Sequence, residues 1–122
     1  MAMDLTPVFE ACADGTLSEE MVTWRDEHCV TVVMAADGYP GSYPKGDVIT
    51  GLDEAAATGA TVFHAGTALD EQGQVVTAGG RVLAVTASGP DLGTAVANSY
   101  AGISKIGFSG AQYRRDIASK AL

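Results

Sequence analysis

The sequence predicts an α+β fold, a mainly antiparallel β sheet with flanking helices. Two observations support this prediction. Strand-like segments follow one another between residues 61 and 89 with only turn-sized gaps, and a further strand-like segment precedes them. Segments with the helical spacing of apolar residues stand before and after these strands. Helices at the two ends of a run of strands are typical of α+β proteins with an antiparallel sheet.

The composition is that of a single globular domain spanning residues 1–122. Apolar residues make up 47% of the chain and charged residues 18%, and no apolar run approaches the roughly 20 residues that cross a bilayer. The formal net charge of −8 disfavours nucleic-acid binding, which needs a basic surface. Since the start of the chain lacks a signal-peptide pattern, we expect a cytoplasmic protein. Cys12 and Cys29 are then reduced thiols, and a disulfide is the less favoured alternative.

Residues 4–15 are expected to form a short helix that needs a packing partner. Its apolar side chains recur at the spacing of one buried helical face; they are Leu5, Val8, Phe9 and Cys12. Thr6 is placed to cap the helix, Pro7 fits its first turn and Gly15 ends it. A helix this short is marginal by itself, so it needs another element against which to pack.

The following segments are expected to form a long strand, a short strand and a helical turn. Residues 22–36 are extended, and the apolar, β-branched part from Cys29 to Ala36 is expected to be a covered strand. Trp24, the only tryptophan, is expected to close one end of the core. Within residues 47–59, "DVITGL" could form a short strand, and "DEAAATG" a helical turn that ends at its glycine.

The middle of the chain is expected to contain a hairpin and a further strand. Residues 61–67 and 74–78 are strand-like and flank the turn residues "LDEQG", which predicts that they pair with each other. Residues 81–89, "RVLAVTASG", are expected to form another strand.

The best helix pattern lies after the strands. Leu92, Val96, Ile103 and Ile106 share one face of it. Asp91 is placed to cap its start and Gly107 its end. The tail, residues 108–122, is expected to be a connection followed by a short helical segment.

A stiff segment rich in glycine and proline, "AADGYPGSYPKGDVITG" at Ala35–Gly51, follows the long strand. It contains neither of the common nucleotide-binding glycine motifs, and its prolines remove N–H donors that a phosphate cradle needs. Its single lysine, Lys45, and Arg81 in "AGGRVLAV" both lie beside glycines, where an anion can approach closely. For the glycines at 79–80, a structural tight turn is an equally weighted alternative.

The residues by themselves predict no catalytic side chain and no metal site. Ser42 lacks the sequence frame of a nucleophile elbow, and two cysteines do not complete a metal site. His64 is interpreted as a packed, hydrogen-bonded strand residue, with ligand contact as the alternative. Arg114 and Arg115 could bind an anion. An ion pair, or a position at a solvated helix end, is at least as well supported.

Five stretches of the sequence together resemble a known family. They are "DLTPVFEACADGTL", "CVTVVMAADGYPGSYPKGDVITGL", "VFHAGT", "VVTAGGRVLAVTA" and "QYRRDI". In this order they resemble the C-terminal domain of the phosphoribosylamine–glycine ligases, which belong to the ATP-grasp superfamily. Two positions depart from the family pattern: Asp37 stands where the family usually has a glycine, and the ending reads "RRDIASKAL" where the family has an ending like "RRDIGWRAL". The first could alter how the chain enters the loop, and the second affects local packing.

The resemblance implies a C-terminal domain related to the barrel-sandwich hybrid, without the amino-terminal and ATP-grasp domains of the ligase. It implies a reaction in which ATP activates glycine as an acyl phosphate and the amine of 5-phosphoribosylamine attacks it, in purine biosynthesis. ATP and Mg²⁺ (or Mn²⁺) would be bound mainly by the other domains, so this chain alone is expected to be inactive. Its partners would be those domains and the two substrates.

The resemblance also implies which residues contact substrate. The C-terminal domain of such a ligase closes one side of the active site, with Lys45 and Arg81 attracting the ribose 5-phosphate or the acyl phosphate. The substrate-binding residues expected on this ground are Tyr39, Pro40, Gly41, Lys45, Gly79, Gly80 and Arg81. The alternative is a free-standing carrier or interaction module of the barrel-sandwich type, in which Lys45 would carry an acyl group at a hairpin tip.

Overall fold

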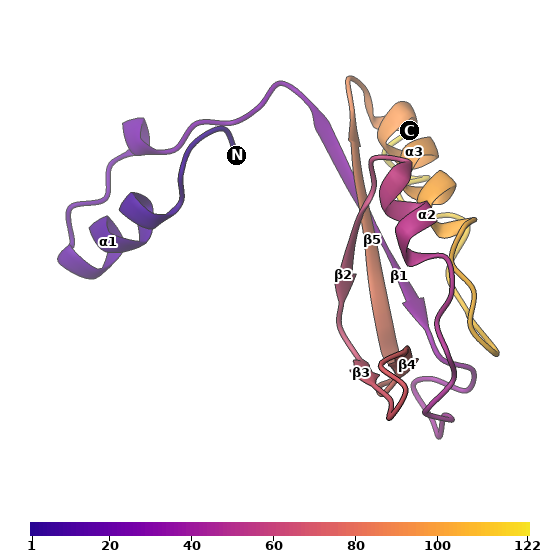
Figure 1. The fold of residues 1–122 in the computed structure, drawn as a ribbon. Helices are drawn as coiled ribbons and strands as arrows, with labels where there is room; N and C mark the ends of the chain where they lie inside the picture. Colours follow the sequence, from indigo (N-terminus) through magenta and orange to yellow (C-terminus); the bar gives the residue numbers. More distant parts are fainter.

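The computed structural model describes residues 1–122 as a sheet domain and an amino-terminal arm, which comprises residues 1–27 (Figure 1). The helices are α1 (Thr6–Asp14), α2 (Leu52–Ala57) and α3 (Leu92–Ile103), with one 3₁₀ turn at Glu19–Met21. The strands are β1 (His28–Ala35), β2 (Thr61–His64), β3 (Thr67–Leu69), β4 (Val75–Thr77) and β5 (Arg81–Gly89). This order of elements is close to the one that the sequence predicts.

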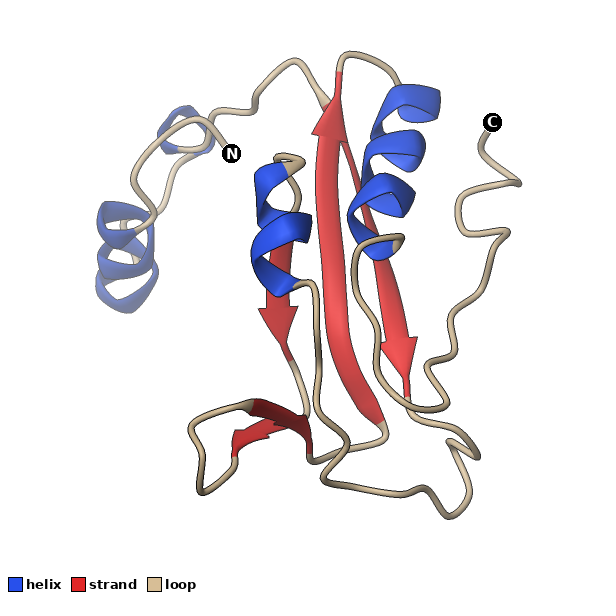
Figure 2. Cartoon of the chain, turned by 45° about the vertical axis from the view of Figure 1, so that its right-hand side comes forward, coloured by secondary structure: helices blue, strands red, loops and turns tan.

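Strand β5 is the centre of the main sheet (Figure 2). β1 and β2 pair with it on either side, both antiparallel, and β3 and β4 form a separate antiparallel pair. The predicted α+β class with antiparallel sheets is therefore confirmed. The predicted hairpin is only partly right, because β3 pairs with β4 while β2 pairs with β5. Ala65 and Gly66 both donate their N–H groups to the carbonyl of Val82 at 3.0 Å, and this turns the chain from one sheet to the other.

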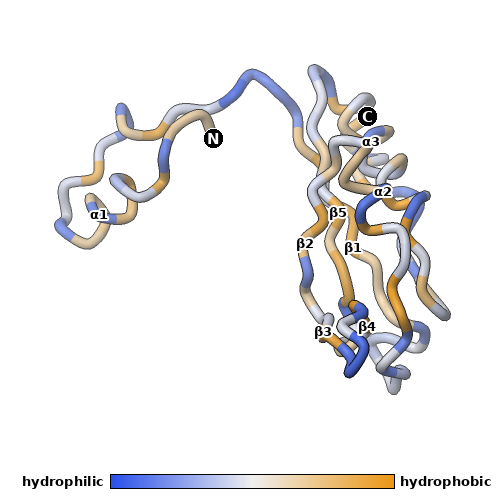
Figure 3. The backbone as a smooth tube through the Cα atoms, in the orientation of Figure 1, coloured by the Kyte–Doolittle hydropathy of each residue, from blue (hydrophilic) through white to orange (hydrophobic).

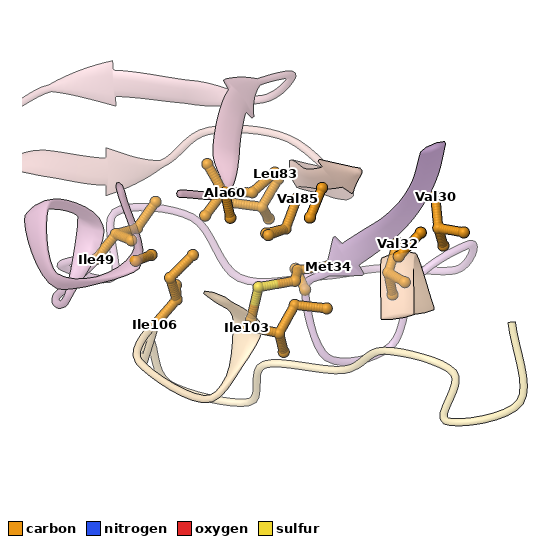
Figure 4. Close-up of a cluster of buried hydrophobic side chains, with 14 residues drawn as sticks. Val30, Val32, Met34, Ile49, Ala60, Leu83, Val85, Ile103 and Ile106 are labelled. Atoms are coloured by element: carbon orange, nitrogen blue, oxygen red, sulfur yellow. The ribbon is translucent and has the colours of Figure 1, made fainter. Parts of the chain in front are cut away.

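The core lies between one face of the main sheet and helices α2 and α3 (Figures 1 and 4). Its larger side chains are Val30, Val32, Met34, Ile49, Leu83, Val85, Ile103 and Ile106. The opposite face of the sheet, called the open face below, is uncovered: Val33 is 42% exposed and Phe63 55% exposed. The prediction of a covered strand at 29–36 is thus right for one face only, because alternate side chains of β1 point away from the core.

Helix α3 begins where the sequence predicts, but it ends earlier. The carboxylate of Asp91 caps it by accepting the N–H of Thr94 at 2.7 Å. This hydrogen bond holds the pKa of Asp91 below its ordinary value, because it favours the ionised carboxylate. The C-cap residue is Ser104, and Gly107 lies beyond the helix in an isolated bridge.

The arm contains the predicted helix α1, and the expected burial of its apolar face is right for Val8 and wrong for Leu5, Phe9 and Cys12. Pro7 lies in the first turn, and Gly15 ends the helix at a φ of 70°, both as predicted. Phe9 is nevertheless 65% exposed and Trp24 71% exposed, so Trp24 does not close the core. Figures 1 and 3 show the arm reaching away from the sheet domain. Helical spacing tells which side chains share a face, and it does not tell whether another element covers them.

Three smaller predictions also need correction. Leu5 occupies the N-cap position of α1, and Thr6 donates its N–H to the carboxylate of Asp4, which precedes the helix. Residues 47–52 form no strand, because Val48 and Thr50 each meet a different partner segment in an isolated bridge. The tail contains turns and no helix.

Both cysteines are free, as predicted, and both are exposed, although Cys12 was expected on a buried helical face and Cys29 in a covered strand. None of the helices has the length and apolar character that crossing a bilayer requires.

Candidate functional site

The segment rich in glycine and proline uses its own amide groups internally. The N–H of Gly41 donates to the carbonyl of Gly38 at 2.7 Å. The N–H of Gly46 donates to the carbonyl of Thr77, also at 2.7 Å. Donors bonded in this way are not free to cradle a phosphate, which agrees with the prediction that this segment is no nucleotide-binding loop.

The ring of Tyr39 lies against Gly80, and this contact requires a glycine. A β carbon at position 80 would clash with two ring carbons of Tyr39, and it would lie 3.0 Å from the ring of Tyr43. The N–H of Ala36 also donates to the carbonyl of Gly80 at 2.8 Å. These contacts join the segment after β1 to the start of β5, where Arg81 is the first residue.

Two open grooves meet at the end of β1 and the start of β5, and Val33, Tyr39 and Arg81 line both of them. The glycine groove has a volume of about 480 Å³ and is also lined by Ala65, Gly66, Gly79, Gly80, Leu83 and Ala84. The tail groove has a volume of about 470 Å³ and is also lined by Ala35, Gln112, Tyr113 and Arg114. A ligand that enters either groove therefore meets Tyr39 and Arg81.

Two backbone segments approach each other closely in the wall of the glycine groove. A β carbon on Gly66 would lie 2.5 Å from the carbonyl oxygen of Arg81 and 2.8 Å from the Cα of Gly79. A β carbon on Gly79 would lie 3.1 Å from the Cα of Gly66. Glycine is needed where two backbones come this close, so the shape of the groove depends on both residues.

Arg81 is an exposed cation without an acidic partner. The ion pairs of the structure are Arg25–Glu27 and Arg114–Asp116. No carboxylate therefore neutralises Arg81, which lines both grooves. A guanidinium in this position presents a planar fork that suits a carboxylate or a phosphate group.

The amides of Gly79 and Gly80 add two hydrogen-bond donors beside Arg81. Neither N–H donates to a carbonyl or side chain of the protein, although Gly80 is buried. Buried N–H groups are normally paired, and both glycines line the glycine groove, so these two donors remain for a ligand or a solvent molecule. Together these groups can hold an anion. Neither groove is lined by a carboxylate, histidine or thiol that could act as a base or nucleophile.

Contacts between the tail and the end of β1 form one wall of the tail groove. Gln112 and Ala35 exchange backbone hydrogen bonds of 2.7 and 2.9 Å. The side-chain amide of Gln112 donates to the carboxylate of Asp37 at 2.6 Å, so the aspartate that departs from the family pattern ties the loop to the tail. Arg114 donates two hydrogen bonds to Asp116, at 2.8 and 2.6 Å. They raise the pKa of Arg114 and lower that of Asp116, so the ion-pair alternative holds for Arg114.

Four of the predicted substrate-binding residues line the glycine groove; they are Tyr39, Gly79, Gly80 and Arg81. The remaining three, Pro40, Gly41 and Lys45, line neither groove. Lys45 instead lies over the ring of Tyr43, with its Nζ atom 5.8 Å from the ring centre. For all of these residues, contact with substrate stays a prediction.

Sequence reasoning missed several residues that line the grooves, including Val33, Gly66, Gln112 and Tyr113. A signal for Gly66 exists in "FHAGT", where a glycine interrupts a strand pattern and so indicates close backbone approach. The tail residues carry no local signal, because the partner of Gln112 is Ala35, far away in the sequence.

The remaining candidate groups of the sequence do not join this site. No three His, Cys, Asp or Glu side chains are arranged to hold a metal ion. The Nδ1 atom of His64 lies 2.9 Å from the hydroxyl of Thr67, so this histidine is hydrogen-bonded, although it is exposed rather than packed. The largest groove, about 520 Å³, lies where the arm meets the main sheet and includes Trp24 and Cys29. It is lined by none of the predicted substrate-binding residues.

The fold and the grooves can now be compared with known proteins. Residues 29–120 match the family described as phosphoribosylglycinamide synthetase, C domain. The match covers most of the chain, which therefore belongs to the phosphoribosylglycinamide synthetase C-domain family.

The relatives with similar sequences include phosphoribosylamine–glycine ligases and a trifunctional purine biosynthetic protein. The chain is 53% identical to the ligase of Synechocystis sp. over 123 residues, which is 100% of this chain and 29% of that protein. It is 52% identical over 120 residues to the trifunctional purine biosynthetic protein adenosine-3 of Gallus gallus, covering 98% of this chain and 12% of that protein. The crystal structure of the ligase from Thermotoga maritima is similar with a TM-score of 0.65 and 40% identity, over 72% of this chain and 21% of that one. The chain thus spans less than a third of the ligases that it matches and corresponds to their C-terminal part.

Proposed function

We propose that this chain is the C-terminal domain of a ligase that joins glycine to 5-phosphoribosylamine, with hydrolysis of ATP to ADP and phosphate, in purine biosynthesis. The domain forms one wall of the active site. The observation that carries the proposal is the unpaired Arg81 between two grooves, beside the unpaired amides of Gly79 and Gly80. The names of the relatives support the reaction. Because both cysteines are free thiols, we place the ligase in the cytoplasm.

The role of these groups follows from the charge of the reactants. 5-Phosphoribosylamine carries a phosphate, and glycine carries a carboxylate that becomes an acyl phosphate. The fork of Arg81 and the amides of Gly79 and Gly80 would hold one of these anions in a fixed orientation, while the ring of Tyr39 limits its position. Holding two reactants in a fixed geometry is a large part of catalysis in a reaction that joins them, so the contribution of this domain is binding and orientation.

Two observations support binding of ATP and its metal ion outside residues 1–122. The amides of Gly41 and Gly46 are bonded internally, and no cluster of metal-ligating side chains is present in residues 1–122. We therefore assign ATP and Mg²⁺ (or Mn²⁺) to polypeptide outside these residues, and no step at the nucleotide is derived for this domain. The other domains of the ligase are, on this proposal, its obligatory partners.

The carrier alternative finds no support in the structure. A carrier lysine would stand at a hairpin tip, and the tip between β3 and β4 has the sequence "DEQGQ", without a lysine. Lys45 lies instead in the long loop between β1 and α2.

The proposal predicts that residues 1–122 alone hydrolyse no ATP above background in the presence of glycine and 5-phosphoribosylamine, because the nucleotide site lies elsewhere. ADP release, followed by a coupled assay, is the measurement. The intact Synechocystis ligase, assayed in the same mixture, is the positive control. Turnover by the chain alone would contradict the assignment of ATP to other domains.

A further inference from the structure

The turn that follows β1 sets the position of Tyr39 at the grooves. Tyr39 donates its N–H to the carbonyl of Ala36 at 3.2 Å, which closes a turn with Asp37 and Gly38 at its two central positions. Gly38 has a φ of 85°, a value that glycine adopts without strain. Ala36 also donates its N–H to the carbonyl of Gly80 at 2.8 Å. The path of the chain through this turn therefore decides where the ring of Tyr39 meets Gly80.

Asp37 is the side chain that joins this turn to the tail. Its carboxylate accepts a hydrogen bond from the side-chain amide of Gln112 at 2.6 Å, and hydrogen bonds to an ionised group are stronger than neutral ones. Gly110 lies against the same residue, because a β carbon on Gly110 would be 2.6 Å from the β carbon of Asp37. Asp37 and Gln112 are 75 positions apart, so their contact joins two distant segments of the chain.

The tail that Asp37 contacts is one wall of the tail groove. Gln112 and Tyr113 line this groove together with Tyr39 and Arg81, and the last two also line the glycine groove. Asp37 itself lines neither groove. It can therefore act on a ligand only through the residues that it holds in place.

We propose that Asp37 is a positioning residue for the substrate: its hydrogen bond to Gln112 fixes the tail relative to Tyr39 and so sets the width of the tail groove beside Arg81. The backbone hydrogen bonds between Ala35 and Gln112 join the tail to β1, whereas Asp37 joins the tail to the turn that carries Tyr39. This inference rests on the proposed function, because it takes the ligand at Arg81 to be the anionic substrate.

A direct effect of the charge of Asp37 would have the opposite sign. A carboxylate near an anion site repels the anion, so by charge alone its removal would lower the KM for 5-phosphoribosylamine. Loss of a positioning contact raises the KM instead. Asp37→Asn separates the two effects, because it removes the charge and keeps an acceptor oxygen for the amide of Gln112.

The kinetic experiment uses a chimera, the Synechocystis ligase in which residues 1–122 of this chain replace the matched part. Asp37→Ala should raise the KM for 5-phosphoribosylamine about 5-fold and leave kcat within about 2-fold, because a loosened wall weakens binding of the ground state and the transition state alike. Asp37→Asn should keep the KM within about 2-fold of wild type. Asp53→Ala, which removes an exposed carboxylate that lines neither groove, is the matched control and should have wild-type kinetics.

Gln112→Ala tests whether Asp37 acts through its hydrogen-bond partner. This variant should also raise the KM about 5-fold, and the double variant with Asp37→Ala should show about 5-fold rather than about 25-fold, because the two side chains form one interaction. Multiplied effects would mean that the two residues act separately, and they would overturn the inference. A KM that falls in Asp37→Ala, or in Asp37→Asn, would overturn it in favour of a charge effect.

A second experiment uses residues 1–122 as they stand and does not depend on the reaction. Ala35 and Gln112 each donate their backbone N–H to the carbonyl of the other. Hydrogen–deuterium exchange of these two amides should be about 5-fold faster in Asp37→Ala, because the contact next to this bridge is lost and the bridge opens more often. The amide of the buried Val85 in β5 should exchange as in wild type. Unchanged exchange at Ala35 and Gln112 would overturn the inference.

The two experiments separate this inference from the proposed function. A chimera that forms product, with the wild-type KM in Asp37→Ala, would overturn the inference and leave the function intact. A folded chimera that forms no product would contradict the function. Faster exchange at Gln112 in the isolated Asp37→Ala chain would still support the role of Asp37 in holding the wall of the tail groove.

Discussion

Arg81→Ala should lower kcat/KM for 5-phosphoribosylamine about 100-fold in a chimeric ligase, because it removes a bidentate, charge-assisted contact with the substrate anion. The chimera is the Synechocystis ligase in which residues 1–122 of this chain replace the matched part. The melting temperature should not change, since Arg81 is exposed and belongs to no ion pair. Steady-state kinetics with varied 5-phosphoribosylamine and a thermal melt of the same sample measure the two quantities.

Two further variants make this result specific to the guanidinium. Arg81→Lys should recover only part of the activity, because an ammonium group supplies charge without the planar fork. Lys120→Ala, which removes an exposed cation that lines neither groove, should have wild-type kinetics. A lower melting temperature with normal kinetics in Arg81→Ala would show that this arginine is structural.

Gly66→Ala should destabilise the isolated chain by about 3 kcal/mol, the upper part of the range for overpacking a close contact. The added methyl group would lie 2.5 Å from the carbonyl oxygen of Arg81 and 2.8 Å from the Cα of Gly79, and backbone atoms cannot move aside as a flexible side chain can. Urea unfolding gives the free energy of unfolding. In the chimera, the same variant should raise the KM for 5-phosphoribosylamine, because the backbone must shift to accommodate the methyl group and this deforms the glycine groove.

Gly107→Ala is the matched control for this substitution. Its added methyl group would lie 3.4 Å from the hydroxyl of Thr50, which is an ordinary contact distance, so the free energy of unfolding should change by less than about 1 kcal/mol. Equal stability losses in the two variants would mean that the close approach of Gly66 and Gly79 does not shape the groove.

The sequence predicted best those elements whose signals are local. Helix α3 and its cap at Asp91 follow from apolar spacing and one capping residue, and strand β5 from a run of apolar and β-branched residues. The pairing of β2 was wrong because pairing is a long-range property. Residues 61–64 could pair with either neighbouring strand in the sequence. The turn at Ala65 and Gly66 places them beside β5.

The arm shows a second limit of sequence reasoning. Its helix was predicted correctly from spacing, but the expectations that Phe9 is buried and that Trp24 closes one end of the core were wrong. An apolar face predicts that something packs on it and leaves the partner undetermined.

The candidate site was predicted in part, and the reason differs between its two halves. Arg81 and its preceding glycines were recognisable because an arginine beside paired glycines suits an anion. The tail half was not recognisable, because Gln112 and Tyr113 reach the groove only through the pairing of Gln112 with Ala35. Lys45, a candidate from sequence, lines neither groove.

The central claim is that this chain supplies one wall of the ligase active site. The most direct test is formation of glycinamide ribonucleotide by the chimeric ligase from ATP, glycine and 5-phosphoribosylamine, measured against the Synechocystis ligase with its matched C-terminal part deleted. We expect product from the chimera and none from the deleted enzyme. A folded chimera without product, or a deleted enzyme that retains full activity, would contradict the claim.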